Sequence, residues 1–161
     1  IDWTIDRLKP AFLSGSRKKK IWKFLTELPL AYKFEDILFV HGSPRDATME
    51  YILRNDGTDY FGTVSSKLVD IFSRFERICF VGHTHDPGVF TTDGTFHTPQ
   101  DLNYEIDTRN KGKLIINVGS VGQPRDGDPR ACYAVYEDGI VRWRRVPYKL
   151  EYTMEKIKVG R

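Results

Sequence analysis

The chain has 161 residues, 40% of them hydrophobic and 29% charged, and its 25 Lys and Arg against 22 Asp and Glu give a formal net charge of +3. This length suits one domain with a core of its own, and the composition excludes a disordered polymer, a disulfide scaffold and a membrane-embedded chain. The slight positive charge does not by itself indicate nucleic-acid binding. No apolar run approaches the ~20 residues of a transmembrane helix and no secretory signal is evident, so we expect a cytoplasmic protein without a membrane partner.

The first predicted element is a helix that runs to about Leu28. Ser14 and Ser16 are its candidate caps, apolar residues recur along one face, and Pro29 ends it. Four consecutive cations at residues 17–20 fall in its first turn, where a solvated helix end is the ordinary explanation.

A hairpin over residues 30–34 and 37–40 follows, and its second run is continuously apolar, as in a buried strand. Thr63 is a candidate cap for the next helix. The buried stripe of that helix is predicted to consist of Leu68, Ile71, Phe72 and Phe75. A second buried strand over residues 78–81 comes directly after it.

Hairpins dominate the rest of the chain. We expect one over residues 89–96 and another over 131–146, each with an Asp-Gly turn, and a third buried strand over 114–118 between them. A short helix over 150–158 closes the sequence. Helices early and hairpins late predict an α/β fold in which a mixed sheet has helical cover on one side.

Three of the four histidines follow buried strands: His41 follows the strand over 37–40, and His83 and His85 follow the strand over 78–81. In open α/β sheets, ligands bind in the crevice beyond the carboxyl ends of the strands. Neutral imidazole is the commonest metal ligand, and a glycine beside each strand end permits the tight turn that a ligand-bearing loop needs. Each histidine alone is more simply an ordinary loop residue, but the three together predict a metal site.

A glycine-rich loop follows the third buried strand. Gly119 and Gly122 flank Ser120, so backbone N–H groups there can form an anion nest, and Arg125 can meet a phosphate with its fork of donors. We therefore place Asn117, Gly119, Ser120 and Arg125 on the substrate side of the same crevice. Without the histidines, a plain turn would explain this loop equally well.

Three motifs follow the buried strands in chain order: His41-Gly42-Ser43-Pro44, Gly82-His83-Thr84-His85 and the loop from Asn117 to Arg125. In order and spacing they resemble the carboxyl-terminal motifs of calcineurin-like metallophosphoesterases, in the small prokaryotic phosphodiesterase and phosphatase branch. The resemblance covers residues 14–146. It implies a four-layer α/β/β/α sandwich, of which this chain would form the carboxyl-terminal half, with a mixed sheet and hairpins.

The resemblance also implies an activity. In that family two divalent ions, usually manganese, iron or zinc, hydrolyse phosphoesters by means of a metal-bridging hydroxide. Carried over, His41 and His83 would bind one ion and His85 the other. The substrate would be a phosphorylated small molecule or a nucleotide, with a phosphoprotein left open, and no catalytic residue is assigned within this chain.

The family's Asp-x-His, Gly-Asp-x-x-Asp and Gly-Asn-His-Asp/Glu motifs do not occur in this sequence. In the family they supply the bridging carboxylate, an asparagine ligand and a histidine proton donor. Two close cations without a carboxylate between them repel each other. We therefore expect residues 1–161 to be the carboxyl-terminal part of a single metallophosphoesterase domain and to be inactive alone.

Two other readings stay open. The absent motifs suit a non-catalytic scaffold that keeps the metallophosphoesterase fold. The residues themselves also suit a mononuclear zinc hydrolase, in which His41, His83 and His85 bind one ion and water is the fourth ligand. The long hairpins leave a homodimer open.

Overall fold

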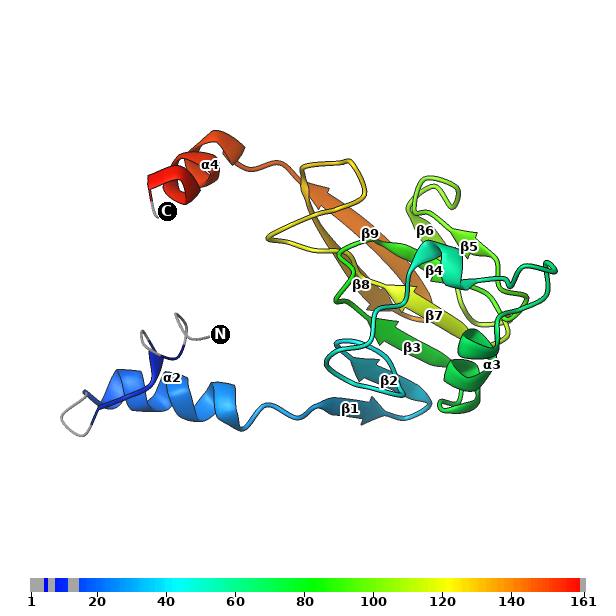
Figure 1. Cartoon of the computed structure of the whole chain (residues 1–161), viewed down its shortest axis with the longest axis horizontal. Helices are drawn as coiled ribbons and strands as arrows, with labels where there is room; N and C mark the ends of the chain where they lie inside the picture. Colours follow the sequence, from blue (N-terminus) through cyan, green and yellow to red (C-terminus); the bar gives the residue numbers. More distant parts are fainter. Residues whose placement is uncertain (1–4, 6–7, 12–14, 160–161) are drawn as a thin grey trace. The chain divides into compact units, whose positions relative to one another are not determined.

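The computed structural model describes residues 5, 8–11 and 15–159. These belong to two compact units, Ile1–Leu30 and Ala31–Arg161, whose elements are labelled in Figure 1. The first unit contains helix α2 (Ser16–Thr26), whose side chains are not buried. Gly15 occupies its N-cap position in an extended conformation and no side chain caps it, so the predicted cap at Ser16 is wrong, because the helix already includes that residue. Ser14 lies outside the described residues.

The second unit opens with the predicted hairpin, formed by β1 (Ala31–Phe34) and β2 (Ile37–Val40). A short 3-10 turn, η1 (Arg54–Asp56), precedes helix α3 (Ser66–Ser73). The N-cap of α3 is Ser65, whose hydroxyl accepts a hydrogen bond from the backbone N–H of Leu68. The predicted cap at Thr63 is wrong, because that hydroxyl donates to Asp59 instead.

A mixed six-stranded sheet forms the centre of this unit, with the order β1-β2-β3-β7-β4-β5 (Figure 1). Its remaining strands are β3 (Ile78–Val81), β4 (Gly88–Phe90), β5 (Phe96–His97) and β7 (Leu114–Asn117). The three neighbours β2, β3 and β7 run parallel, and the pairs toward both edges are antiparallel. The carboxyl ends of β2, β3 and β7 therefore lie along one edge, where the three motif-bearing loops begin.

A second, antiparallel sheet has the order β6-β9-β8. Its strands are β6 (Glu105–Asp107), β8 (Ala131–Glu137) and β9 (Ile140–Val146), and helix α4 (Leu150–Val159) follows. The hairpin of β8 and β9 and the closing helix were predicted, whereas β6 was not. Only Ile106 of its three residues is buried, which is too short a pattern to indicate a strand.

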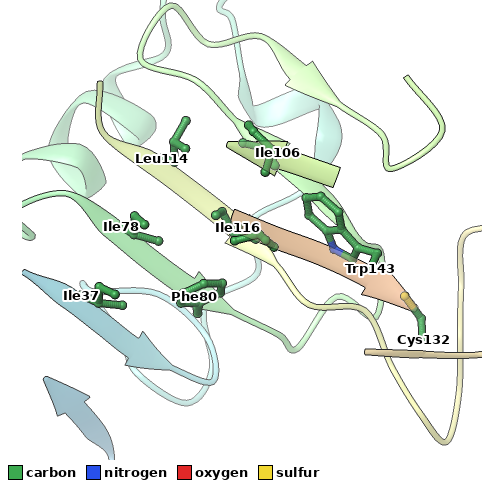
Figure 2. Close-up of a cluster of buried hydrophobic side chains, with 10 residues drawn as sticks. Ile37, Ile78, Phe80, Ile106, Leu114, Ile116, Cys132 and Trp143 are labelled. Atoms are coloured by element: carbon green, nitrogen blue, oxygen red, sulfur yellow. The ribbon is translucent and has the colours of Figure 1, made fainter. Parts of the chain in front are cut away.

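Alternation along the central strands produces two apolar cores. Ile78 and Phe80 pack toward the three-stranded sheet, where Trp143 is 2% exposed (Figure 2). Cys79 and Val81 point the other way, toward Leu68, Ile71 and Phe72, the buried residues of α3. Phe75, the fourth residue predicted for this stripe, is buried in the same core but follows the end of the helix. A helix layer, the six-stranded sheet and the three-stranded sheet therefore stack in that order, as the predicted α/β class requires.

Both cysteines, Cys79 and Cys132, lie in these cores with free thiols. Burial raises the pKa of the Cys79 thiol to about 12 and that of the Cys132 thiol to about 11, so both side chains are packing groups rather than nucleophiles. Among the described residues, no helix combines the length and the apolar character that a bilayer crossing needs.

Candidate functional site

Two of the predicted ligands meet at the carboxyl edge of the parallel strands. His41 follows β2 and His83 follows β3, and their ring atoms Nε2 and Nδ1 lie 2.9 Å apart. The backbone N–H of Gly82 donates to the carbonyl of His41 at 3.0 Å, which ties the two loops together. Parallel pairing of β2 with β3 therefore brings together two imidazoles that are 42 positions apart in the chain.

The surroundings of His83 fix which nitrogen faces His41. Its Nε2 lies 3.3 Å from the carbonyl oxygen of Met49, and as the donor of that hydrogen bond it carries the ring proton. The lone pair is then on Nδ1, on the side of His41. Burial lowers the pKa of His41 below its ordinary value, and the nearby rings of His83 and His85 lower it further. The lowered pKa favours the neutral form of His41, the form that binds metal ions.

His85, the third predicted ligand, is anchored to the glycine-rich loop. Its Nδ1 lies 2.8 Å from the carbonyl oxygen of Gln123, which fixes the proton on Nδ1 and leaves Nε2 free. Its own carbonyl accepts a hydrogen bond from the backbone N–H of Arg125 at 3.1 Å. His83 and His85 both have φ near 60°, in the left-handed region that non-glycine residues rarely adopt and that clusters at functional sites.

Asn117 is the residue that joins the histidine loop to the glycine-rich loop. It is 5% exposed, and its amide donates to the carbonyl of Gly82 at 2.9 Å and to the hydroxyl of Thr84 at 2.7 Å. Its side-chain oxygen accepts from the backbone N–H of Gly119 at 2.9 Å. All of these contacts position the loops, and the sequence analysis did not predict Thr84 as a partner of Asn117.

The other residues predicted on the substrate side differ in how far their surroundings constrain them. Gly119 has φ +84°, and a Cβ there would lie 2.7 Å from the sulfur of Cys132, so only glycine fits. The Ser120 hydroxyl accepts from the backbone N–H of Gln123 at 3.0 Å. Arg125 is exposed and donates to the side chain of Gln123 at 2.7 Å. The substrate-side role of this loop stays a prediction.

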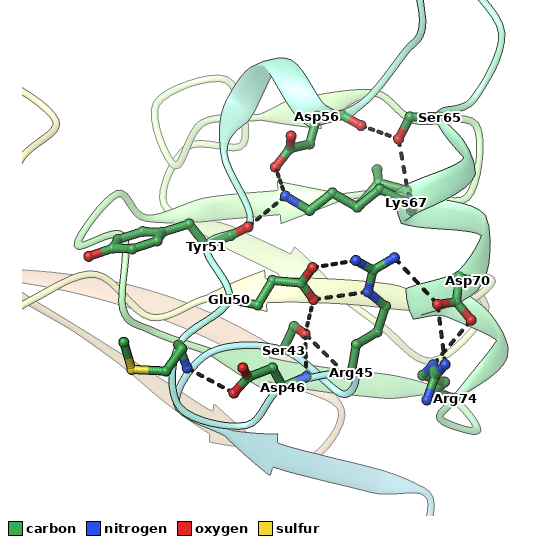
Figure 3. Close-up of polar contacts among 12 residues, drawn as sticks. Ser43, Arg45, Asp46, Glu50, Tyr51, Asp56, Ser65, Lys67, Asp70 and Arg74 are labelled. Atoms are coloured by element: carbon green, nitrogen blue, oxygen red, sulfur yellow. Dashed lines mark hydrogen bonds and ion pairs between the residues drawn. The ribbon is translucent and has the colours of Figure 1, made fainter.

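A polar network that the sequence analysis missed shapes the loop after His41 (Figure 3). The buried hydroxyl of Ser43 donates to Glu50 and accepts the backbone N–H groups of Arg45 and Asp46 at 3.0 and 3.1 Å. The guanidinium of Arg45 binds Glu50 at 2.6 Å and reaches Asp70 on α3 at 3.4 Å. The opposite charges of Arg45 and Glu50, five positions apart, were the available signal for this closed loop.

The donor set can be tested for its fit to a metal ion. Two imidazole nitrogens that bind one ion at ~2.0–2.1 Å lie about 3 Å apart at ordinary coordination angles. The 2.9 Å between His41 Nε2 and His83 Nδ1 satisfies this condition. In the part of the chain that the structure describes, no group of three or more His, Cys, Asp or Glu side chains is placed to share one ion. The residues present therefore fit two ligands of a larger set.

Comparison with known proteins identifies the family. The profile described as the calcineurin-like phosphoesterase superfamily domain matches residues 16–138. The chain belongs to this superfamily. The resemblance to calcineurin-like metallophosphoesterases that was read from the motifs is therefore confirmed.

Relatives agree with this assignment. The chain is 31% identical over 150 residues to the uncharacterized protein MJ0912 of Methanocaldococcus jannaschii, with 89% of the chain and 56% of the relative aligned. It is similar to a crystal structure of a metallophosphoesterase from Sphaerobacter thermophilus, with a TM-score of 0.73 and 33% identity over 91% of the chain and 59% of the other. This similarity confirms the predicted metallophosphoesterase fold.

A more distant similarity concerns the fold alone. The hypothetical protein PH1004 of Pyrococcus horikoshii OT3 has a TM-score of 0.58 and 18% identity, over 98% of this chain and 59% of that one. Against all three relatives, the chain spans somewhat more than half of their length.

Proposed function

We propose that this chain supplies part of a dinuclear phosphoesterase site that hydrolyses a phosphorylated small molecule or a nucleotide. His41 and His83 would bind one divalent ion, and His85 would bind the other. The observation that carries the proposal is the 2.9 Å approach of two imidazole nitrogens at the ends of adjacent parallel strands, in a member of the calcineurin-like phosphoesterase superfamily.

The chain's own residues prepare the ligands. His83 offers Nδ1 because its Nε2–H is held by Met49, and His85 offers Nε2 because its Nδ1–H is held by Gln123. When bound, divalent ions supply Lewis-acid stabilisation of phosphoryl charge and make a water molecule more acidic. Arg125, exposed on the loop that anchors His85, would orient the phosphate with its guanidinium.

A site with two metal ions needs carboxylate ligands, and the family motifs that supply them do not occur in this sequence. Because bare cations at close range repel each other, we propose that residues 1–161 contribute the histidine ligands of a single domain and that the remaining ligands lie outside them. On this proposal, residues 1–161 expressed alone would not hydrolyse phosphoesters.

The experiment uses the full-length protein that the gene encodes. With added manganese it should hydrolyse bis-p-nitrophenyl phosphate, and His83→Ala should lower kcat by about 100-fold or more and reduce the bound metal from two ions per chain, since loss of a ligand disrupts the charge stabilisation that the ion supplies. His97→Ala is the matched control, because His97 lies on β5 and not among the predicted ligands. A full-length protein that binds no metal, or whose His83→Ala variant retains full activity, would refute the proposal.

A further inference from the structure

An aromatic side chain lies directly against the proposed metal ligands. The ring of Tyr51 stacks on the imidazole of His83, with centroids 3.9 Å apart and planes inclined by 28°. Tyr51 is nevertheless 44% exposed, so the contact with His83 leaves much of the ring in solvent. A ring that served only to cover the imidazole would not need this exposure.

Met49, two positions before Tyr51 in the same loop, is also exposed. Met49 is 69% exposed, and its carbonyl oxygen is the one that contacts His83. Between them, Glu50 turns inward to Ser43 and Arg45. This arrangement directs the one charged side chain into the loop and leaves the side chains of Met49 and Tyr51 exposed, with the Tyr51 ring against His83.

The loop holds Tyr51 in place before any ligand arrives. Its carbonyl accepts a hydrogen bond from the ammonium group of Lys67 at 2.7 Å, and Lys67 is paired with Asp56 at 2.6 Å. On the other side, Glu50 is fixed by the Arg45 guanidinium at 2.6 Å. Figure 3 shows the ring of Tyr51 pointing away from both anchors. Because the backbone of Tyr51 is anchored and its ring already stacks on His83, the ring loses little freedom when a ligand stacks on it.

We propose that Tyr51 is a binding platform for a planar aromatic group, such as a nucleobase, that is attached to the phosphate of the substrate. This inference rests on the proposed function, because the phosphate must occupy the metal site for its attached group to reach the platform. Stacking of a base on an aromatic side chain, judged by removal of that side chain, is worth about 10-fold or more in affinity.

The test compares two probes that share a phosphate and a sugar but differ in the base. Binding of adenosine 5′-monophosphate and of ribose 5-phosphate to the full-length protein with added manganese is measured by calorimetry. We expect the base to improve affinity by about 10-fold, Tyr51→Phe to keep this preference and Tyr51→Leu to abolish it while ribose 5-phosphate binds as before. Tyr60→Leu is the matched control, because Tyr60 is 97% exposed and its ring pairs with Phe61 rather than with His83.

Two results would overturn the platform alone. Either both probes bind the unaltered protein equally, or Tyr51→Leu weakens both of them by the same factor, which would make Tyr51 only a support for His83. If neither probe binds although circular dichroism shows a folded protein, the phosphoesterase proposal fails as well. Binding of ribose 5-phosphate thus separates the failure of the platform from the failure of the proposed function.

Discussion

Replacing Asn117 should damage stability and the site together. Asn117→Ala removes three hydrogen bonds, at 2.9, 2.7 and 2.9 Å, from a side chain that is 5% exposed. At roughly 1 kcal/mol net for each bond, the loss is about 3 kcal/mol, and it rises if the carbonyl of Gly82 or the N–H of Gly119 finds no new partner. The variant should also bind manganese more weakly, because the loop that carries His83 and His85 loses its hydrogen bonds to Asn117.

Urea unfolding followed by circular dichroism measures the first effect, and metal titration measures the second. Asn110→Ala is the control, since Asn110 is exposed and surface substitutions usually change stability by less than about 0.5 kcal/mol. If Asn117→Ala lost no more stability than this control, the reasoning that its buried amide holds the two loops would be wrong.

Three further outcomes follow from other positions. Gly119→Ala should lower the free energy of unfolding by about 1–3 kcal/mol, because its φ is +84° and the new Cβ would lie 2.7 Å from the sulfur of Cys132. Gly122→Ala is the control, because a Cβ there would have nothing within 4 Å, and it should be nearly neutral in the same urea titration. Arg145→Met leaves the buried carboxylate of Asp126 without its cation and should cost about 3 kcal/mol of stability in thermal denaturation. Arg109→Met breaks only the exposed pair with Asp107 and should cost under about 1 kcal/mol. Hydrogen bonds from the guanidinium of Arg130 lower the pKa of Asp128 to about 2 from its ordinary 3.8. Its stabilising contribution should be complete above about pH 4 and be lost as pH falls toward 2, so Asp128→Asn should flatten that part of the urea-midpoint profile.

The sequence predicted most elements of Ala31–Arg161 because its central strands are continuously apolar and its turns carry Asp-Gly pairs. It missed β6, whose pairing with β9 depends on tertiary contacts rather than on pattern. It misplaced the cap of α3, because Thr63 and Ser65 both have suitable hydroxyls and only the fold decides which one faces the helix.

At the site, the sequence predicted which histidines lie at strand ends but not how each one is oriented. Orientation depends on backbone carbonyls, those of Met49 and Gln123, which have no signature in the sequence. The same limit applies to Tyr51, whose contact with His83 joins two loops through ring stacking. Asn117 was predicted at the substrate side, and the structure places its side chain in loop contacts.

The parallel register of β2 and β3 makes the histidine pair sensitive to a slip between the strands. Phe39 of β2 is paired with Phe80 of β3, and His41 and His83 lie two and three positions after these paired residues. A shift of one residue would send alternate side chains to the opposite faces of the sheet and separate the two imidazoles. Their contact also joins segments distant in the chain, and long-range parallel pairing forms slowly. The appearance of metal affinity during refolding should therefore report the moment at which these two strands lock into the native alignment.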